Sequence, residues 1–258
     1  MKHTAILSPR GRSPFGGHPV YLIILDLSLY FLVLLYNRPM NIFSGETYKN
    51  TLKRIVDVCG AIILIIFFSP ICLLAAICIK LGSKGPVLAD VPQRVGLKGK
   101  LFTMHKFRSM ILNAHHMLRN DVEFKHLYEE YKKSSFKLRK DPRITSVGKF
   151  LRKHSIDEIP QFINVLSGEM SLVGPRAYYQ DELEDQQKKY PHTRPLVAKV
   201  LSVRPGITGL WQVSGRSEIN FDKRIAIDAE YVDNVSLMTD LQIMLKTPLE
   251  MIQGKGAV

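Results

Sequence analysis

The stretch VCGAIILIIFFSPICLLAAICI, from Val58 to Ile79, decides the fold of this chain, because its 22 residues include no charged side chain. An α-helix of that length is about 33 Å long, which is enough to cross the hydrocarbon core of a bilayer. The stretch begins too far into the chain, and is too long, to be the core of a secretory signal. It therefore predicts a membrane helix over residues 55–80.

Two features favour a re-entrant hairpin over a straight span. Ser69 and Pro70 lie at the middle of the run, where a proline removes a backbone donor and kinks or breaks the helix. Basic residues flank both ends of the run, and positive residues favour the cytoplasmic side of a membrane. The flanking residues are Lys49, Lys53, Arg54, Lys80 and Lys84. A helix that is broken at Ser69-Pro70 and returns to one face satisfies both observations.

The chain upstream of this run is an N-terminal extension, residues 1–49. It contains a second apolar stretch, Val20 to Tyr36, which Asp26 interrupts, and an acid makes spanning a membrane costly. Three interpretations of this stretch stay open. It could be an interfacial helix, a short membrane span, or sequence that precedes an internal start at Met40. The main domain is expected to cover residues 50–258.

The charge of the chain points to an anionic partner. The 258 residues include 36 Lys and Arg against 23 Asp and Glu, a net charge of +13. Nucleic acid, anionic lipid and a phosphorylated substrate all fit such a charge. The three cysteines, Cys59, Cys72 and Cys78, lie inside the apolar run, which argues against disulfides and against a zinc site.

The rest of the chain predicts an α+β fold, a mostly helical cytoplasmic domain with a short β-hairpin. Residues 87–104 read as a strand pair with a turn at Leu97–Lys100. Residues 111–133 have apolar side chains at helical spacing and predict one amphipathic helix.

The stretch KFLRKHSIDEIPQFINVLSGEMSLVGPR, residues 149–176, contains the candidate chemistry. Asp157 and Glu158 are adjacent acids, and Ser155-x-x-Glu158 fits a capping box at a helix start. Cations surround the two acids, with Arg152 before them and Arg176 in a Gly-Pro-Arg turn after them. Such cations keep carboxylates ionised and bind phosphate. The cluster can hold a divalent metal and a diphosphate, with one carboxylate as nucleophile.

Further candidates for phosphate binding lie in two other segments. One segment contains Gln93, Arg94, Lys106 and Arg108, whose alternation also fits a solvated strand face. The other is RPGITGLWQ, which begins at Arg204 and contains the only tryptophan, Trp211. Its Pro-Gly pair indicates a tight turn.

These motifs, in this order, resemble the bacterial sugar transferase family, the monotopic phosphoglycosyl transferases. The resemblance covers about residues 50–250, and its ending is most similar to undecaprenyl-phosphate galactose or glucose phosphotransferases. The motifs are KRIVD (53–57), SKGPV (83–87), QRVG (93–96), KFRSM (106–110), SIDEIPQFINVLSGEMSLVGPR (155–176) and RPGITGLWQVSGR (204–216).

The resemblance implies transfer of a sugar 1-phosphate from a UDP-sugar to undecaprenyl phosphate, with release of UMP and a requirement for Mg²⁺. The family's Asp-Glu pair falls on Asp157 and Glu158, which the family uses for covalent catalysis and for metal or proton handling. Its phosphate-binding arginine falls on Arg152, and its Gly-Pro-Arg motif falls on Gly174, Pro175 and Arg176, a further candidate for phosphate binding. The implied location is the cytoplasmic face of the bacterial inner membrane, at the first step of exopolysaccharide or O-antigen assembly. Arg152 and the metal are expected to keep the pKa of Asp157 low.

Two other readings compete with an enzyme. A membrane scaffold of a polysaccharide assembly complex would keep the apolar run without needing the Asp-Glu pair and its arginines. A nucleic-acid binder fits the charge alone, but the sequence has no recognition helix and no row of aromatic residues between bases, so no nucleic-acid partner is expected. The segment from Leu237 to Ile252 has apolar residues enough to lie on the membrane or to meet a second copy.

Overall fold

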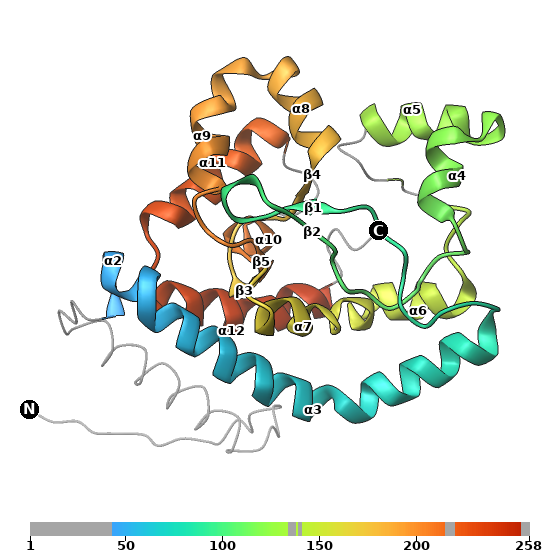
Figure 1. Ribbon diagram of the computed structural model, residues 1–258, viewed down its shortest axis with the longest axis horizontal. Coiled ribbons are helices and arrows are strands. Elements are labelled where there is room, and N and C mark those ends of the chain that lie inside the picture. Colours follow the sequence, from blue (N-terminus) through green and yellow to red (C-terminus); the bar gives the residue numbers. More distant parts are fainter. Residues whose placement is uncertain (1–42, 134–137, 139–140, 215–219, 254–258) are drawn as a thin grey trace, which may run out of the picture. The chain divides into compact units, whose positions relative to one another are not determined.

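The fold is known from a computed structural model, which describes residues 43–133, 138, 141–214 and 220–253. The second apolar stretch predicted at residues 20–36 lies outside the described residues. Helices dominate, and two small sheets connect them (Figure 1). The helical segments are α2 (Gly45–Thr47), η2 (Tyr48–Leu52), α3 (Lys53–Gly82), η3 (Leu97–Gly99), α4 (Ala114–Asn120), η4 (Val122–Phe124), α5 (Lys125–Lys133), α6 (Ser146–Lys153), η5 (Ile156–Glu158), α7 (Gln161–Leu166), α8 (Gln180–Lys189), η6 (Pro191–Thr193), α9 (Arg194–Val200), α10 (Leu210–Val213), α11 (Phe221–Asp233) and α12 (Leu237–Gln253).

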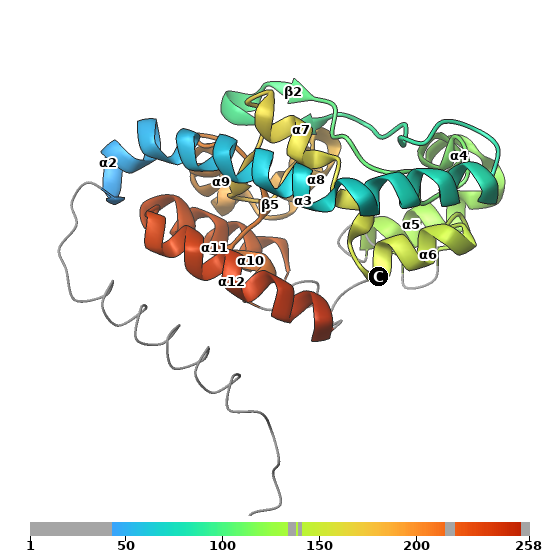
Figure 2. The ribbon, with the colours of Figure 1, turned by 90° about the horizontal axis from the view of Figure 1, so that it is seen from below.

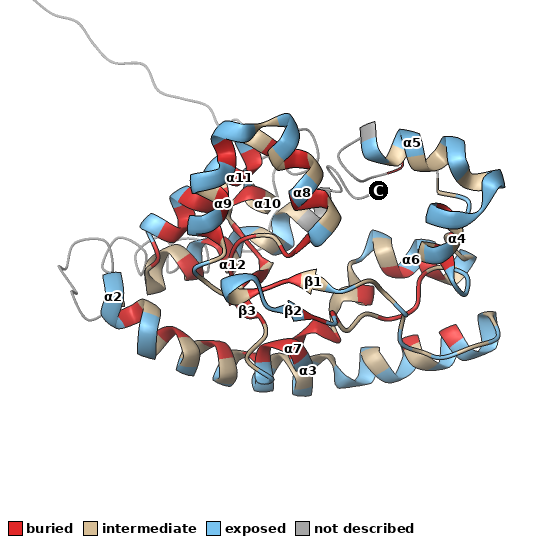
Figure 3. Cartoon of the chain, turned by 45° about the horizontal axis from the view of Figure 1, so that its top comes forward, coloured by how far each residue is buried: buried red, intermediate tan, exposed pale blue. Residues whose placement is uncertain are grey.

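The apolar run forms α3, which lies along the lower side of the domain in Figure 1 and runs across the middle of the view from below in Figure 2. The helical stretch Gly45–Gly82 is the one helix among the described residues that is long and apolar enough to cross a membrane. Only 11% of its most apolar window is buried, so this stretch is not the core helix of a soluble domain. Figure 3 shows the exposed residues along α3. Apolar side chains more than half exposed include Ile63, Ile66, Phe67, Leu73, Leu74 and Leu81.

The helix is not broken at Ser69-Pro70, which corrects the predicted break. Pro70 lies inside α3, and Figure 1 shows that α3 changes direction near its middle. A proline leaves the carbonyl four residues earlier without its helical donor, and that carbonyl belongs to Ile66. The Ser69 hydroxyl donates to this oxygen at 2.8 Å, so the orphaned acceptor is filled and the helix bends without ending. The return of both ends to one membrane face stays a prediction.

The predicted hairpin is confirmed. Strands β1 (Arg94–Val95) and β2 (Leu101–Phe102) pair antiparallel around η3. Strand β4 (Tyr178–Tyr179) pairs with the other edge of β1, so that Arg94 lies between Phe102 and Tyr179.

The second sheet contains two parallel strands, β3 (Ser171–Val173) and β5 (Gly206–Thr208). The chain after β3 passes very close to the chain before β5. A Cβ atom on Gly206 would lie 2.0 Å from the backbone nitrogen of Gly174, so neither position has room for a side chain. This approach explains the glycines of the Gly-Pro-Arg and Arg-Pro-Gly turns.

The predicted helix over residues 111–133 is wrong as a single element. It is divided into α4 and α5, with η4 between them, because Asp121 adopts an extended conformation (φ −83°, ψ 130°). Aspartate competes for backbone donors and favours such helix boundaries, which overrides the apolar spacing here.

Three apolar clusters hold the elements together. One packs the amino-terminal part of α3 against α7, β3 and α12, and a second fills the space between β1, β4, α8, α9 and α11. The third, which contains Ala75, Ile79, Phe107 and Leu151, holds the carboxyl-terminal part of α3 against α6. The turn η5 between α6 and α7 is therefore fixed above the middle of α3.

Candidate active site

Asp157 and Glu158 lie in η5, a single 3-10 turn. Ser155, just before the turn, adopts the left-handed conformation (φ 53°), and its side chain makes no capping hydrogen bond. The capping-box reading is therefore wrong. Non-glycine residues seldom adopt this conformation, and such strain is typical of functional sites. The backbone carbonyl of Asp157 accepts a hydrogen bond from the Phe107 N–H at 2.9 Å, which fixes the turn against the segment that contains Lys106.

Asp157 is buried, with 6% of its surface exposed. Burial raises the pKa of its carboxyl above the usual range, and Lys106 and Arg152 oppose this shift. The negative charge of Glu158 adds to the increase. Without a metal ion, burial thus outweighs Arg152, and the expected low pKa stays a prediction for the metal-bound site. The charged form of Asp157 depends on the cations that surround it.

Glu158 has the opposite shift. Burial alone would raise its pKa, but Lys106 outweighs burial and lowers it, with contributions from Arg176 and Arg152. The Lys106 ammonium donates to Glu158 Oε1 at 2.7 Å. Two adjacent carboxylates thus have different protonation behaviour, a pattern that often separates catalytic roles.

Arg176 approaches the acids from the loop between β3 and β4. Its backbone N–H donates to Asp228 Oδ2 at 3.2 Å, and its guanidinium lies 5.3 Å from the centre of the Trp211 ring. The Tyr178 hydroxyl donates to the same Asp228 oxygen at 3.1 Å. Burial raises the pKa of Asp228 to about 7, although these donors and Arg224 oppose the shift.

Buried polar atoms without partners gather around Arg176. Tyr178 is buried among them, and Arg224 forms an ion pair with Glu182 at 3.3 Å. Almost every buried polar atom in a protein has a hydrogen-bond partner, so such a group of atoms is positioned to pair with water or with a bound polar molecule. The atoms without a partner within the described residues include Arg94 Nε, Arg176 Nε, Glu182 Oε2, Trp211 Nε1, Arg224 Nε and Asp228 Oδ1.

The residues predicted for the site do not all lie beside Asp157 and Glu158. Lys106 and Arg152 act to lower the pKa of both acids, and Arg176 contributes to the lowered pKa of Glu158. Arg94 lies on the Tyr179 ring, 3.3 Å from its centre, and donates to the Ala177 carbonyl.

Three predicted phosphate ligands lie elsewhere. Gln93 is exposed just before β1. Arg108 is 5% exposed, and its guanidinium donates to the carbonyls of Pro86, Lys84 and Ser83. Its donors therefore hold the segment after α3, which argues against the predicted phosphate-binding role. Arg204 lies just before β5, where its Nε donates to the Gly168 carbonyl at 2.8 Å.

Several residues of the site were not predicted from the sequence, and they include Tyr178, Glu182, Arg224 and Asp228. Arg224 and Asp228 alternate with the buried residues Phe221, Ile225 and Ala229 on α11. Charged residues on the apolar face of a helix, four positions apart, were the available signal.

The acids fit the magnesium ion that the family resemblance implies. Among the described residues no three His, Cys, Asp or Glu side chains form a ready-made metal cage. Mg²⁺ is usually held by one or two carboxylates together with substrate phosphates. Asp157 and Glu158 supply such a pair, beside cations that suit a diphosphate.

Comparison with known proteins identifies the family of this chain. The sequence profile of the bacterial sugar transferase family matches residues 48–254. The chain is 38% identical over 243 residues to the undecaprenyl-phosphate galactose phosphotransferase of Salmonella typhimurium LT2, covering 94% of this chain and 49% of that protein. It is 40% identical over 208 residues to the exopolysaccharide production protein ExoY of Sinorhizobium fredii, covering 80% and 87%. It is 34% identical over 233 residues to the undecaprenyl-phosphate glucose phosphotransferase of Komagataeibacter xylinus, covering 88% and 40%.

Proposed function

The chain belongs to the bacterial sugar transferase family, and from this premise we propose that it transfers a sugar 1-phosphate from a UDP-sugar to undecaprenyl phosphate. The observation that supports this proposal most is the pair Asp157 and Glu158, held in one turn among Lys106, Arg152 and Arg176. Both substrates are phosphate anions, and convergent cations in a buried site bind such groups strongly.

Asp157 is the proposed nucleophile. Its carboxylate attacks the β-phosphorus of the UDP-sugar, the bond between that phosphorus and the bridging oxygen breaks, and UMP leaves. The product is an aspartyl-phosphosugar. A phosphate oxygen of undecaprenyl phosphate then attacks the same phosphorus and releases Asp157. One carboxylate thus serves a soluble donor and a lipid acceptor in turn, which predicts ping-pong kinetics.

The neighbouring side chains have separate proposed roles. Lys106 holds Glu158 ionised through its 2.7 Å ion pair and, with Arg152, favours the charged form of Asp157. Arg176 binds the phosphoryl oxygens as their negative charge grows. A magnesium ion held by Asp157 and Glu158 would neutralise the diphosphate and stabilise the leaving UMP.

The donor sugar is proposed to be galactose or glucose, by analogy with the relatives named above. The reaction would be the first step in assembling the repeat unit of an exopolysaccharide or O-antigen. We place the catalytic domain on the cytoplasmic face of the inner membrane, with α3 embedded as a bent, re-entrant helix. The exposed apolar side chains of α3 and the basic residues at both of its ends support this placement.

Release of UMP by the detergent-purified protein tests the proposal. The assay contains undecaprenyl phosphate, Mg²⁺ and one donor at a time: UDP-galactose, UDP-glucose, UDP-N-acetylglucosamine or UDP-N-acetylgalactosamine. One donor is expected to yield UMP, and Asp157→Asn is expected to reduce the rate on the order of 10⁴-fold or more with unchanged membrane association. The matched control is Asp185→Asn, because Asp185 is a partly exposed acid that pairs with Lys132.

Two outcomes would contradict the proposal. Near-full activity of Asp157→Asn would exclude this nucleophile. No UMP from any donor, in protein shown to be folded, would favour the scaffold reading.

A further inference from the structure

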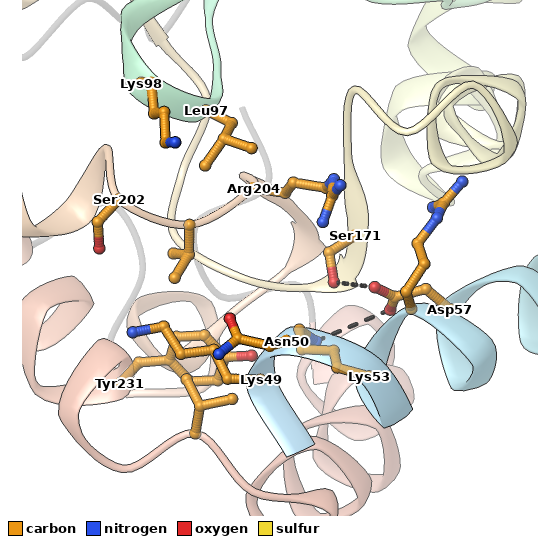
Figure 4. A pocket seen from close by; sticks show the side chains of 13 residues that line it. Lys49, Asn50, Lys53, Asp57, Leu97, Lys98, Ser171, Ser202, Arg204 and Tyr231 are labelled. Carbon is orange, nitrogen blue, oxygen red and sulfur yellow. Dashed lines mark hydrogen bonds and ion pairs between the residues drawn. The ribbon is translucent and has the colours of Figure 1, made fainter. Parts of the chain in front are cut away.

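A cavity of about 300 Å³ lies beside the amino-terminal part of α3 (Figure 4), and neither Asp157 nor Glu158 is among the residues that line it. Its lining is strongly cationic. Five basic side chains contribute to it, against one carboxylate, that of Asp57. The basic residues are Lys49, Lys53, Arg54, Lys98 and Arg204.

Two of these cations already have strong partners. Lys53 lies 2.7 Å from Asp240 Oδ2 and 3.7 Å from Asp57 Oδ1. Arg54 donates to the backbone carbonyls of Val165 and Leu166 at 2.6 and 2.9 Å. These two side chains are therefore already engaged in contacts that hold the fold together.

The other three cations are not neutralised in this way. The Lys49 ammonium lies 3.6 Å from Glu46, which is 78% exposed, and such exposed pairs contribute little. The side chain of Lys98 makes no hydrogen bond or ion pair with the described residues. Arg204 uses only its Nε, so both terminal nitrogens are available within the described part of the chain.

These three cations reach the cavity from three separate segments: η2, the β1–β2 hairpin and the loop before β5. Bringing like charges together costs free energy unless an anion lies between them. The backbone is strained at one of them. Lys98 adopts the left-handed conformation (φ 55°), and its N–H donates to the Leu201 carbonyl at 2.7 Å, which fixes the hairpin tip beside the cavity. A lysine kept in a conformation that favours glycine or asparagine suggests a use for its charge.

The cavity is distinct from the candidate active site. Ser171 and Arg204 lie at the amino-terminal ends of the parallel pair β3 and β5. The residues that line the cavity include neither of the two acids nor the cations around them, Lys106, Arg152 and Arg176. The cavity also lacks a free carboxylate, because Asp57 accepts hydrogen bonds from Ser171 and from the Leu172 N–H.

We propose that this cavity is a second anion site, which binds a phosphate group through Lys49, Lys98 and Arg204. The inference goes beyond the proposed transfer, because the site contains no reacting group. Two sources could supply the phosphate: the headgroup of an anionic membrane lipid, or a soluble phosphate. The position favours a lipid, since the exposed apolar residues Ile55 and Ile62 follow on the same helix.

Binding is tested without nucleotide sugar, so the result does not depend on turnover. Full-length protein in a neutral detergent is titrated by calorimetry with dihexanoylphosphatidylglycerol and, separately, with inorganic phosphate. The test variant is Lys49→Gln with Lys98→Asn, because asparagine tolerates the left-handed conformation. The control variant is Lys100→Asn, on the same hairpin but outside the cavity lining. Melting temperatures establish whether each variant is folded. If the double variant is unfolded, the single variant Lys98→Asn is tested in its place.

We expect the wild type to bind at least one probe and the control variant to match it. Each lost ammonium is expected to weaken binding about five-fold, hence about 25-fold for the pair. Tighter binding of the lipid would identify a headgroup site, and tighter binding of inorganic phosphate a soluble ligand. The proposal is overturned by three results: no binding of either probe, equal binding by the wild type and the double variant, or an equal loss in Lys100→Asn.

Discussion

Two buried ionic networks of similar composition behave differently in this molecule. The first joins α3 to α12 through Asp240, whose two oxygens accept hydrogen bonds from Tyr48, Lys53 and Tyr231, each at 2.7 Å. The second lies behind Arg176, where Asp228 and Glu182 are fully buried. One oxygen of each of these two acids has no partner among the described residues.

The difference separates residues whose hydrogen bonds are completed within the fold from residues with polar atoms left for another partner. A completed buried network stabilises one arrangement, and loss of one member leaves the others unpaired. An incomplete network contributes less to stability, but it offers donors and acceptors to an incoming polar molecule. The first network fixes α3 to the domain. The second surrounds the arginine that we propose binds the sugar phosphate.

The largest expected effect on stability is in the completed network. Asp240→Ala removes the common acceptor and leaves Lys53 buried with a longer ion pair to Asp57. We expect a loss of about 3–5 kcal/mol in the free energy of unfolding, the usual result of breaking a buried pair. Denaturant unfolding in detergent measures it. Asp233→Ala is the control, since Asp233 forms an exposed pair with Lys199 and its loss is expected to change stability by less than about 1 kcal/mol.

Equal losses of unfolding free energy in Asp240→Ala and Asp233→Ala would contradict a stabilising role for the Asp240 network.

Arg176→Ala tests the incomplete network. We expect the rate of UMP release to fall about 10²–10³-fold, as for other removed phosphoryl or oxyanion donors. The melting temperature is expected to fall much less than in Asp240→Ala, because the Arg176 guanidinium has an unpartnered buried nitrogen. Kinetics and thermal unfolding on the same preparation give both numbers. A variant with full activity and a large loss of stability would assign Arg176 to the fold instead.

The smallest effect is a pH dependence in the incomplete network. The pKa of Asp228 is raised by burial to about 7, from 3.8, so between these values the folded protein keeps a proton that the unfolded chain has lost. This contribution to stability is complete below about pH 4, falls as the pH rises toward 7, and is constant above 7. The groups that face Asp228 are the Arg176 N–H, the Tyr178 hydroxyl and the Arg224 guanidinium.

Asp228→Asn should remove a slope of about 1 kcal/mol per pH unit from the stability profile between pH 4 and 7. Denaturant unfolding at several pH values measures the slope. Asp233→Asn, on the same helix but exposed, should keep the wild-type profile. An unchanged slope in Asp228→Asn would show that Asp228 is ionised throughout this range.

Much of the site's location was predictable from the sequence, because it depends on neighbours in the chain. Asp157 and Glu158 are adjacent, and Arg152 is five residues earlier, so a helical or turned conformation of this segment brings all three together. The protonation of the acids was not predictable. The pKa of Asp157 depends on its burial beneath segments 50 residues away, and burial outweighs the nearby cations.

The roles of individual arginines could not be predicted from the sequence either. Arg108 and Arg176 look alike in the sequence, as basic residues in short motifs. Arg108 donates to three carbonyls after α3, whereas Arg176 lies over Trp211 with an unpartnered nitrogen. Long-range packing assigns the partners of a guanidinium, and the local sequence does not contain that information.

The sequence by itself determined the apolar helix, the hairpin and the family, because these depend on composition, periodicity and the order of motifs. The tertiary structure alone decided how Ser69 keeps α3 continuous through Pro70, where the helix at 111–133 is divided, and which acids have unfilled oxygens. The physical reason is that a hydrogen bond or an ion pair needs both partners at a fixed distance. Residues far apart in the chain reach that distance only when the core has packed.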